Sequence, residues 1–328
     1  MTGPATRPTF TADDDALHVP GPKHSWTETS WWSFNVPQHR LAGWLYVQVR
    51  PHQNTTAGGA FVYDPRGVAS WQLPFYAMFD HQKLPADLDL RHARLESGVS
   101  IDVVEPRTTY DLGYRFRDEE DFVAQLRFEA IMDPFPYVSG TPPFSASSHY
   151  DQTGRLTGEI ALRGERIAVD CFSLRDRSWG PRPEQWGRRG RLSYAFGTND
   201  ASNAFLAFCH PDPGDPFTDD ESVTTGYLLQ DGQIARLVDG RRRSTRDPTT
   251  RMVQSIELDL EDELGRRLRT RGEAQSAMVL ARHRVTYNTF LRWQDEHGRV
   301  GWGEDQDLWS LPLLADSHRL DHGNSDER

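Results

Sequence analysis

The chain has 328 residues, 37% of them hydrophobic and 11% aromatic, so it can bury the core of one large or two medium domains and is not a disordered chain. Its formal net charge of −11 argues against a nucleic-acid partner, because binding to phosphates needs a cationic face. No apolar run approaches the ~18 residues of a membrane-spanning helix, so no membrane span is predicted.

The N-terminal stretch MTGPATRPTFTADDDALHVPGP has no basic start followed by an apolar core, so it does not read as a secretory signal. We therefore expect a cytoplasmic protein. The two cysteines, Cys171 and Cys209, offer neither a disulfide framework nor metal-type spacing. Both are expected to be buried free thiols.

An aromatic cluster of Trp31, Trp32 and Phe34 lies near the expected first strand. Side chains alternate along a strand, so Trp32 and Phe34 should share one face and Trp31 should lie on the other. One of these sets is expected to line a ligand cavity. The alternative is that all three rings fill the core of a barrel. Asn35 and Glu304 are polar candidates for the same pocket.

Short runs with strand composition recur along the chain, separated by Gly, Pro, Asp and Asn, whereas helical periodicity is hard to find. The segments 230–233, 262–265 and 295–298 contain residues that tolerate positive φ and are predicted hairpin turns. The exposed edges of such an antiparallel meander must be protected, and closure into a barrel is the commonest way to do so. Two β-barrels fit the length of the chain better than one. The sequence thus predicts an all-β protein, with strands at 41–50, 60–63, 99–104, 122–131, 156–162, 167–174, 192–196, 204–209, 223–229, 252–260, 277–285 and 289–294.

Two segments between these strands are predicted to be irregular. The longest irregular segment, residues 132–148, either separates two domains or crosses the mouth of a barrel. The cluster Arg241, Arg242 and Arg243 follows Asp239-Gly240 and is predicted to form a solvated loop.

The stretch SLRDRSWGPR, residues 173–182, places one carboxylate between two arginines at the end of a predicted strand. Alternation puts Phe172, Leu174 and Asp176 on one face, and Arg175 and Arg177 on the other. Desolvation of Asp176 on an apolar face would favour its neutral form, which a proton donor needs near pH 7. The alternative is that Asp176 caps the following turn or pairs with an arginine.

His149, Tyr150 and Asp151 precede a strand that should form a hairpin with the strand leading to Asp176. His149 could therefore approach Asp176 across the pair, although a histidine at a strand start can equally be a structural hydrogen-bonding group. His149, Asp151 and Asp176 show no recognisable metal-ligand spacing, so no metal is predicted. The chain also lacks a nucleophile elbow and a phosphate-binding loop.

Four stretches together resemble the AttH-like superfamily, which includes carotenoid 1,2-hydratase-like proteins: ETSWWSFN (28–35), SHYDQTGRLTG (148–158), DCFSLRDRSWGPR (170–182) and FLRWQDEHGRVGWGE (290–304). The resemblance covers about residues 20–310. It implies two lipocalin-like barrels packed together, which we expect at residues 20–185 and 186–315. It also implies a hydrophobic pocket and no redox cofactor.

In the hydratases of that superfamily, the acid of a Tyr-x-Asp-x-Asn-x-Gly stretch protonates an alkene, assisted by an upstream His-x-Trp pair. On this chain the acid corresponds to Asp176, the glycine to Gly180 and the histidine to His149. The chain departs from the pattern at three positions, where the tyrosine, asparagine and tryptophan are replaced by Leu174, Ser178 and Asp151. The chain therefore lacks two aromatic residues of the pattern. Because an aromatic face can stabilise a carbocation, their loss puts a carotenoid activity in doubt.

The resemblance and the residues together suggest an enzyme, a lyase or an isomerase, that acts on an isoprenoid- or polyene-like molecule by proton-initiated hydration, isomerisation or cyclisation without a cofactor. Asp176 and His149 are the predicted catalytic residues. Two alternatives stay open: a pericyclase that only selects a reactive conformer, and a non-catalytic carrier of a lipophilic metabolite. The predicted ligand contacts are Trp31, Trp32, Phe34, Asn35, Tyr150, Phe172, Leu174, Trp179 and Glu304.

Overall fold

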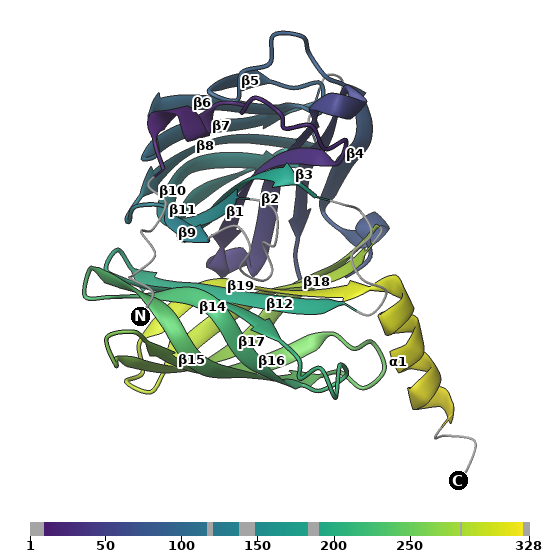
Figure 1. Cartoon of the computed structure of the whole chain (residues 1–328), viewed down its shortest axis with the longest axis vertical. Coiled ribbons are helices and arrows are strands. Elements are labelled where there is room, and N and C mark those ends of the chain that lie inside the picture. The colour runs from purple at the N-terminus through teal and green to yellow at the C-terminus, as the bar shows by residue number, and fades with distance from the viewer. Residues whose placement is uncertain (1–9, 117–120, 138–147, 183–189, 283, 324–328) are drawn as a thin grey trace. The chain divides into compact units, whose positions relative to one another are not determined.

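The computed structural model of the chain describes residues 10–116, 121–137, 148–182, 190–282 and 284–323. Almost every element in these ranges is a β-strand, as predicted (Figure 1). The chain divides into two compact units. Unit 1 comprises Met1–Gln38, Ala42–Val62 and Pro74–Pro183, and unit 2 comprises His39–Leu41, Tyr63–Leu73 and Glu184–Arg328. The irregular segment 132–148 therefore falls within the span of unit 1, and its residues 138–147 lie outside the described ranges.

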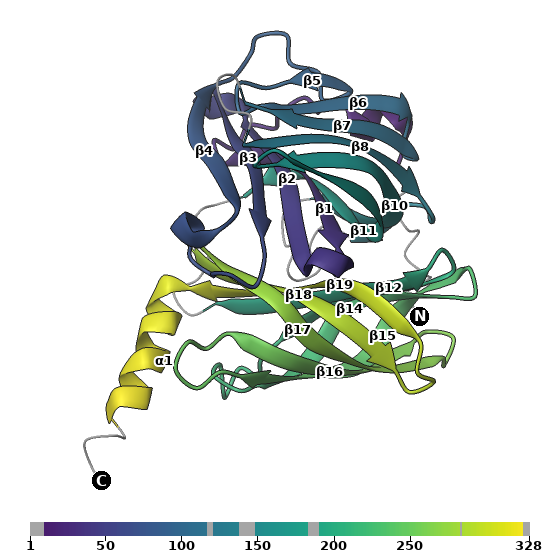
Figure 2. The same cartoon turned by 180° about the vertical axis from the view of Figure 1, so that it is seen from behind.

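Unit 1 is built on one curved sheet of eleven strands (Figure 2). The strand order is β4-β3-β2-β1-β11-β10-β8-β7-β6-β5, and β9 pairs with β10. A short 3-10 helix, η1 (Ala12–Asp15), precedes the sheet. The strands are β1 (Trp26–Val36), β2 (Leu41–Arg50), β3 (Thr55–Tyr63), β4 (Phe75–Lys83), β5 (His92–Arg94), β6 (Val99–Glu105), β7 (Thr109–Arg115), β8 (Phe122–Ala130), β9 (Phe135–Tyr137), β10 (Ser148–Leu162) and β11 (Glu165–Pro181).

Unit 2 is a closed antiparallel barrel of eight strands in sequence order, completed by pairing of its first and last strands (Figure 1). A helix, α1 (Leu311–Gly323), follows the barrel. The strands are β12 (Arg191–Asp200), β13 (Asn203–His210), β14 (Asp220–Gln230), β15 (Gln233–Arg246), β16 (Val253–Asp262), β17 (Arg267–Ala281), β18 (Arg284–Asp295) and β19 (Val300–Ser310).

The predicted all-β architecture of two barrels is confirmed, and the three predicted turns join β14 to β15, β16 to β17, and β18 to β19. Asp231, Gly232, Gly265 and Gly298 adopt positive φ in these turns. Unit 1 differs from a closed barrel, because in the described residues its two edge strands, β4 and β5, do not pair with each other.

The prediction of a solvated arginine loop is wrong, because Arg241, Arg242 and Arg243 lie inside strand β15. Alternation separates them: Arg242 points into the barrel and is fully buried, whereas its two neighbours form ion pairs with Asp220 near the surface. The run of three arginines therefore contains one core residue between two surface residues, and the local charge pattern did not distinguish them.

Strand β11 has two chemically different faces. Its register with β1 and β10 sets Trp31, Asp176 and Asp151 in one row across the sheet. The neighbouring row contains Trp32, Arg175 and Gln152. Since adjacent residues of a strand point to opposite sides, we name these sides the Asp176 face and the Arg175 face.

The Arg175 face carries the aromatic core of unit 1. The Arg175 guanidinium lies 4.1 Å from the centre of the Tyr110 ring and donates hydrogen bonds to the Tyr150 hydroxyl (2.6 Å) and to Gln152 Oε1 (2.9 Å). Gly154 leaves room for this core, because an added Cβ would lie 2.3 Å from the Phe128 ring. The other rings of this core are Trp32, Phe34, Phe75, Tyr114 and Phe122.

Cys171 and Cys209 are buried free thiols, as expected. In the part of the chain that the structure describes, every helix is too short or too polar to cross a membrane.

Candidate active site

The Asp176 face brings the two predicted catalytic residues together. Asp151 lies directly opposite Asp176 in the β10–β11 pair, and His149 lies two residues before Asp151 on the same face. His149 Nε2 is 2.9 Å from Asp151 Oδ2, and His149 Nδ1 is 3.9 Å from Asp176 Oδ2. The imidazole is therefore held between two carboxylates, and all three side chains belong to unit 1.

The environment of Asp176 suits proton transfer near neutral pH. Burial raises the pKa of its carboxyl to about 6, and the negative charge of Asp151 also raises it, while His149 opposes the shift. Asp176 Oδ1 is buried, and no described residue hydrogen-bonds to it. Among the described residues Asp176 pairs with no arginine, so the alternative of an Asp–Arg pair does not hold for them.

The flanking arginines do not neutralise Asp176. Arg175 and Arg177 lie on the opposite face, as alternation predicted, and both are buried there. Arg177 donates a 2.6 Å hydrogen bond to Glu28 Oε2, and Arg175 is held by Tyr150 and Gln152. Each guanidinium therefore has its own partners on its own side of the sheet.

A row of aromatic rings extends from Asp176 across β1, β2, β3 and β4. Trp31 lies directly opposite Asp176, and such pairs bring Cβ atoms to within about 4.5–5.5 Å. The ring centres of Trp31 and Trp44 are 4.9 Å apart, those of Trp44 and Phe61 are 4.9 Å apart, and Tyr76 follows at 6.2 Å. On the other side of the acid, the Tyr137 ring lies 5.3 Å from the ring of His149. The acid and the histidine therefore lie between aromatic side chains.

Four predicted ligand contacts lie away from Asp176. Trp32, Phe34 and Tyr150 belong to the core on the Arg175 face. Trp179 stacks on His18 with ring centres 4.1 Å apart, and Phe10 contacts both Trp179 and Tyr150. Because these side chains point to the other side of the sheet, we no longer place them beside Asp176.

The remaining predicted contacts divide between the two units. Phe172 and Leu174 share the Asp176 face, as alternation predicted, with Phe172 half-buried and Leu174 fully buried. Asn35 lies on β1, and its Nδ2 donates to the Phe172 carbonyl oxygen at 3.4 Å. Glu304 lies on β19 in unit 2, where burial and the nearby Glu304 carboxylate raise the pKa of the Tyr63 hydroxyl.

Sequence reasoning missed the role of Asp151 and the aromatic row beyond Trp31. The spacing of His149 and Asp151 carried the signal for the first, because residues two apart on a strand share a face. Trp44 and Phe61 carried no such signal, since their approach to Trp31 depends on the order of β1, β2 and β3.

The same cluster has the donor set of a metal site. His149, Asp151 and Asp176 each offer one ligand atom, and these atoms lie within 4.8 Å of one another. Imidazole nitrogen with carboxylate oxygen is a combination found at zinc and iron sites. In the geometry observed, however, His149 Nε2 and Asp151 Oδ2 are already at hydrogen-bond distance from each other.

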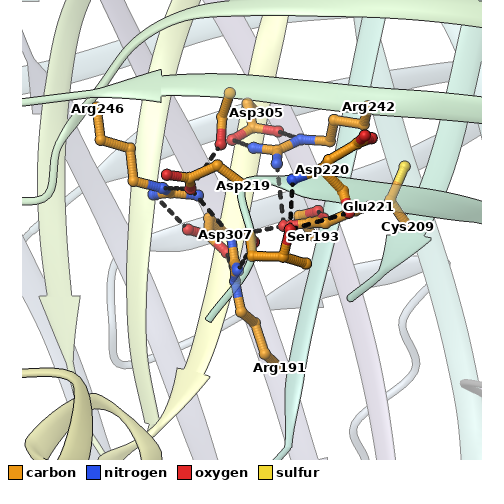
Figure 3. A network of polar contacts seen from close by, with 12 residues as sticks. Arg191, Ser193, Cys209, Asp219, Asp220, Glu221, Arg242, Arg246, Asp305 and Asp307 are labelled. Atoms are coloured by element: carbon orange, nitrogen blue, oxygen red, sulfur yellow. Dashed lines mark hydrogen bonds and ion pairs between the residues drawn. The ribbon is translucent and has the colours of Figure 1, made fainter. Parts of the chain in front are cut away.

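A second group of buried charges lies inside the unit 2 barrel, which also contains a hydrophobic cluster that includes Phe205, Leu260 and Trp293 (Figure 3). Arg242 forms a two-pronged pair with Asp305 (3.0 and 2.8 Å) and lies 3.2 Å from Glu221. Arg191 links Glu221 (2.5 Å) to Asp307 (3.1 Å). These groups are fully buried and form ion pairs with one another, as expected of a structural core more than of a reactive site.

The comparisons with known proteins agree with this architecture. The family model Domain of unknown function (DUF7064) matches residues 11–306. No curated protein matches the sequence. Similar solved structures include kievitone hydratase from Nectria haematococca, at 9% identity and a TM-score of 0.54, covering 94% of this chain and 95% of that one.

Two further structures share this fold. CghA is 12% identical with a TM-score of 0.56, covering 88% of this chain and 89% of its own. A protein assigned as AttH from Nitrosomonas europaea is 14% identical with a TM-score of 0.53, covering 86% of this chain and 91% of that one. At such identities the likeness establishes the fold, which is the one expected from the four sequence stretches.

Proposed function

The chain belongs to the DUF7064 family and has the AttH-like fold, and from this premise we propose that it is an acid–base enzyme acting on a hydrophobic small molecule. The proposed reaction is proton-initiated hydration, isomerisation or cyclisation of an isoprenoid- or polyene-like alkene. The observation that carries the proposal is Asp176, whose Oδ1 is buried and whose pKa is raised to about 6, between a His149–Asp151 pair and an aromatic row.

In the proposed reaction Asp176 donates its proton to one alkene carbon, which leaves a carbocation at the neighbouring carbon and a carboxylate on Asp176. The rings of Trp31 and Trp44 are suited to stabilise that cation through their quadrupoles. His149, oriented by Asp151, then accepts a proton from attacking water or from a carbon next to the cation. Transfer of this proton from His149 to Asp176 restores the starting state.

This mechanism requires neither a metal nor a redox cofactor, and we expect turnover to persist after dialysis against a chelator. Loss of activity on chelation, restored by one divalent metal, would instead favour metal binding at His149, Asp151 and Asp176. The proposed catalytic roles belong to Asp176 and His149, and Asp151 is a positioning residue.

The test is product analysis in deuterium oxide, with kievitone and linear polyenes as probes. A proton-initiated reaction places one solvent deuterium on carbon, and hydration also adds the mass of water. A pericyclic rearrangement gives product without deuterium, and a carrier gives no product.

Substitution then tests the acid. Asp176→Asn keeps the shape of the side chain and removes the proton, so turnover should fall by roughly 10²–10⁴ while probe binding persists. The matched control is Asp170→Asn on the same strand, where the exposed Asp170 pairs with Arg155 at 2.7 Å. Near-wild-type turnover of Asp176→Asn would refute Asp176 as the acid.

A further inference from the structure

A segment outside the sheet is held against the Arg175 face of unit 1 by side chains. Residues 10–16, which we call the strap, precede β1 and contain the single 3-10 turn η1. Arg107 Nη1 donates to the Phe10 carbonyl oxygen at 3.3 Å, and Arg177 Nη2 donates to the Ala16 carbonyl oxygen at 2.7 Å. Among the described residues, no backbone–backbone hydrogen bond joins the strap to the sheet. The strap can therefore leave without breaking a strand pair.

The strap places one carboxylate in a buried site with three donors. Asp15 is buried, the Tyr110 hydroxyl donates to its Oδ1 at 2.6 Å, and Arg107 N donates to its Oδ2 at 2.7 Å. The Nη2 atom of Arg175 lies 3.6 Å from the same Oδ1. Among the described residues, Asp15 is the only carboxylate that pairs with Arg175. A phenol, a backbone amide and a guanidinium that converge on one carboxylate form a carboxylate-binding site.

The donors of this site are positioned by the sheet, not by the strap. Gln152 joins two of them, because its Oε1 accepts from Arg175 Nε at 2.9 Å and its Nε2 donates to the Arg107 carbonyl oxygen at 2.8 Å. The Tyr150 hydroxyl and the Tyr110 ring also hold the Arg175 guanidinium. When the strap leaves, these contacts remain and the guanidinium loses its carboxylate partner, which favours entry of another anion.

The strap also places an apolar group beside the carboxylate site. The centre of the Phe10 ring lies 4.6 Å from that of Tyr150 and 5.8 Å from that of Trp179. The strap and all of these partners belong to unit 1. The space filled by the Phe10 ring and the Asp15 carboxylate is therefore the space that a ligand would gain on replacing the strap.

We propose that the strap occupies a binding site for a monocarboxylic acid with an apolar body, and that such an acid exchanges with it. The ligand carboxylate replaces that of Asp15 at Arg175 and Tyr110, and the apolar body replaces the Phe10 ring. Because the strap competes at a high effective concentration, it weakens the apparent affinity for every ligand and excludes small anions that cannot also replace the ring. This site does not depend on the reaction proposed on the Asp176 face.

The first experiment adds 4-phenylbutanoate to the full-length protein and measures backbone hydrogen exchange. Thr11 N, Asp14 N and Ala16 N are hydrogen-bonded within the strap, whereas Arg107 N donates to Asp15. We expect saturable acceleration of exchange in the strap by about tenfold or more, as the released state changes from a minor to the major population. Arg107 N should stay protected, because the ligand carboxylate accepts its hydrogen bond.

The control is 4-phenylbutan-1-ol, which has the same ring and chain without the charge and should not accelerate exchange in the strap. Equal effects of the acid and the alcohol overturn the proposal. So does an absence of binding by the acid, or binding without faster exchange in the strap. Acceleration at Arg107 N as well would show unfolding of this region in place of exchange at the site. This experiment needs no variant.

The second experiment removes the competing carboxylate. Asp15→Ala deletes the carboxyl group and leaves room for formate beside Arg175, so its melting temperature should be lower than that of the wild type and rise saturably with formate at constant ionic strength. Formamide, which is neutral and of similar size, should have no such effect. The matched control is Asp13→Ala at an exposed position of the same turn. A formate response no larger in Asp15→Ala than in Asp13→Ala overturns the proposal.

Asp15→Ala also tests the competition between strap and ligand. Without its carboxylate the strap competes less well, so 4-phenylbutanoate should bind this variant about tenfold or more tightly than the wild type. Equal or weaker binding would contradict a shared site. Isothermal titration calorimetry of both proteins measures the difference.

Discussion

At the scale of single residues, the difference between Asp176 and Asp170 shows how position on one strand determines acid strength. Burial raises the pKa of Asp176 to about 6, whereas a hydrogen bond from Arg155 lowers the pKa of the exposed Asp170. The two carboxylates are six residues apart and belong to the same strand, β11. The pKa values of these two chemically identical side chains are therefore set by their different environments.

This difference predicts opposite pH dependences of stability. The folded-state pKa of Asp176 lies above its unfolded value of 3.8, so its contribution to stability is complete below about pH 4 and is lost as the pH rises through 6. Asn cannot ionise, so Asp176→Asn should gain roughly 3 kcal/mol in free energy of unfolding relative to the wild type between pH 4 and pH 8. Urea unfolding at both pH values measures this difference.

The control for this experiment is Asp170→Asn. The pKa of Asp170 is lowered on folding, so its contribution is present above its unfolded pKa and is lost as the pH falls. The relative stability of this variant should decrease with rising pH. If both variants changed in the same direction, burial of Asp176 would not be the cause of its raised pKa.

At the scale of strands, β1 separates two adjacent tryptophans into different environments. Trp31 lies on the Asp176 face, in T-shaped contact with Trp44, whereas Trp32 packs near Tyr110 in the core. The sequence predicted this separation but not which tryptophan would accompany the acid. That assignment required the register of β1 with β11.

If the ligand binds on the Asp176 face, only one of these tryptophans should report it. Titration with the neutral apolar probe N-phenyl-1-naphthylamine should change tryptophan fluorescence, and Trp31→Phe should remove most of the change. Trp32→Phe, the matched control, should retain it. The reverse result would place the ligand on the Arg175 face and separate it from Asp176.

Features that depend on local interactions were predictable from the sequence, whereas features that depend on pairing between distant strands were not. The three hairpin turns were predictable because Asp231-Gly232, Gly265 and Gly298 adopt positive φ for local reasons. The proximity of His149 to Asp176 was predictable because one hairpin joins their strands. The approach of Trp44 and the burial of Arg242 depend on pairing between distant strands, which no local pattern reveals.

At the scale of the whole molecule, the two units bury charge in different ways. Unit 1 packs aromatic rings around Arg175, whereas the barrel of unit 2 contains, beside a hydrophobic cluster, arginines and carboxylates that form ion pairs with one another (Figure 3). Such a network adds little net stability when complete, but it is expensive to break because the remaining partner is a buried, unpaired charge.

The network predicts a large difference between two adjacent arginines. Arg242→Met leaves Asp305 and Glu221 without their shared cation and should cost about 3–5 kcal/mol in free energy of unfolding. Arg243→Met, the control, removes an exposed pair with Asp220 and should cost at most about 1 kcal/mol. Urea unfolding of both variants measures the difference, and similar costs would contradict a structural role for the network.

The two-residue turn between β10 and β11 has a consequence for the sign of the charge at the proposed site. Arg163 and Gly164 both adopt positive φ there, and a loop of this length sets which residues of the two strands face each other. Because arginines flank Asp176 in the chain, sliding β11 by one position against its neighbours would turn a guanidinium toward His149 in place of the carboxylate. An insertion or deletion of one residue in this turn, twelve positions before Asp176, could therefore convert an acidic site into a cationic one while every catalytic residue remained in the sequence.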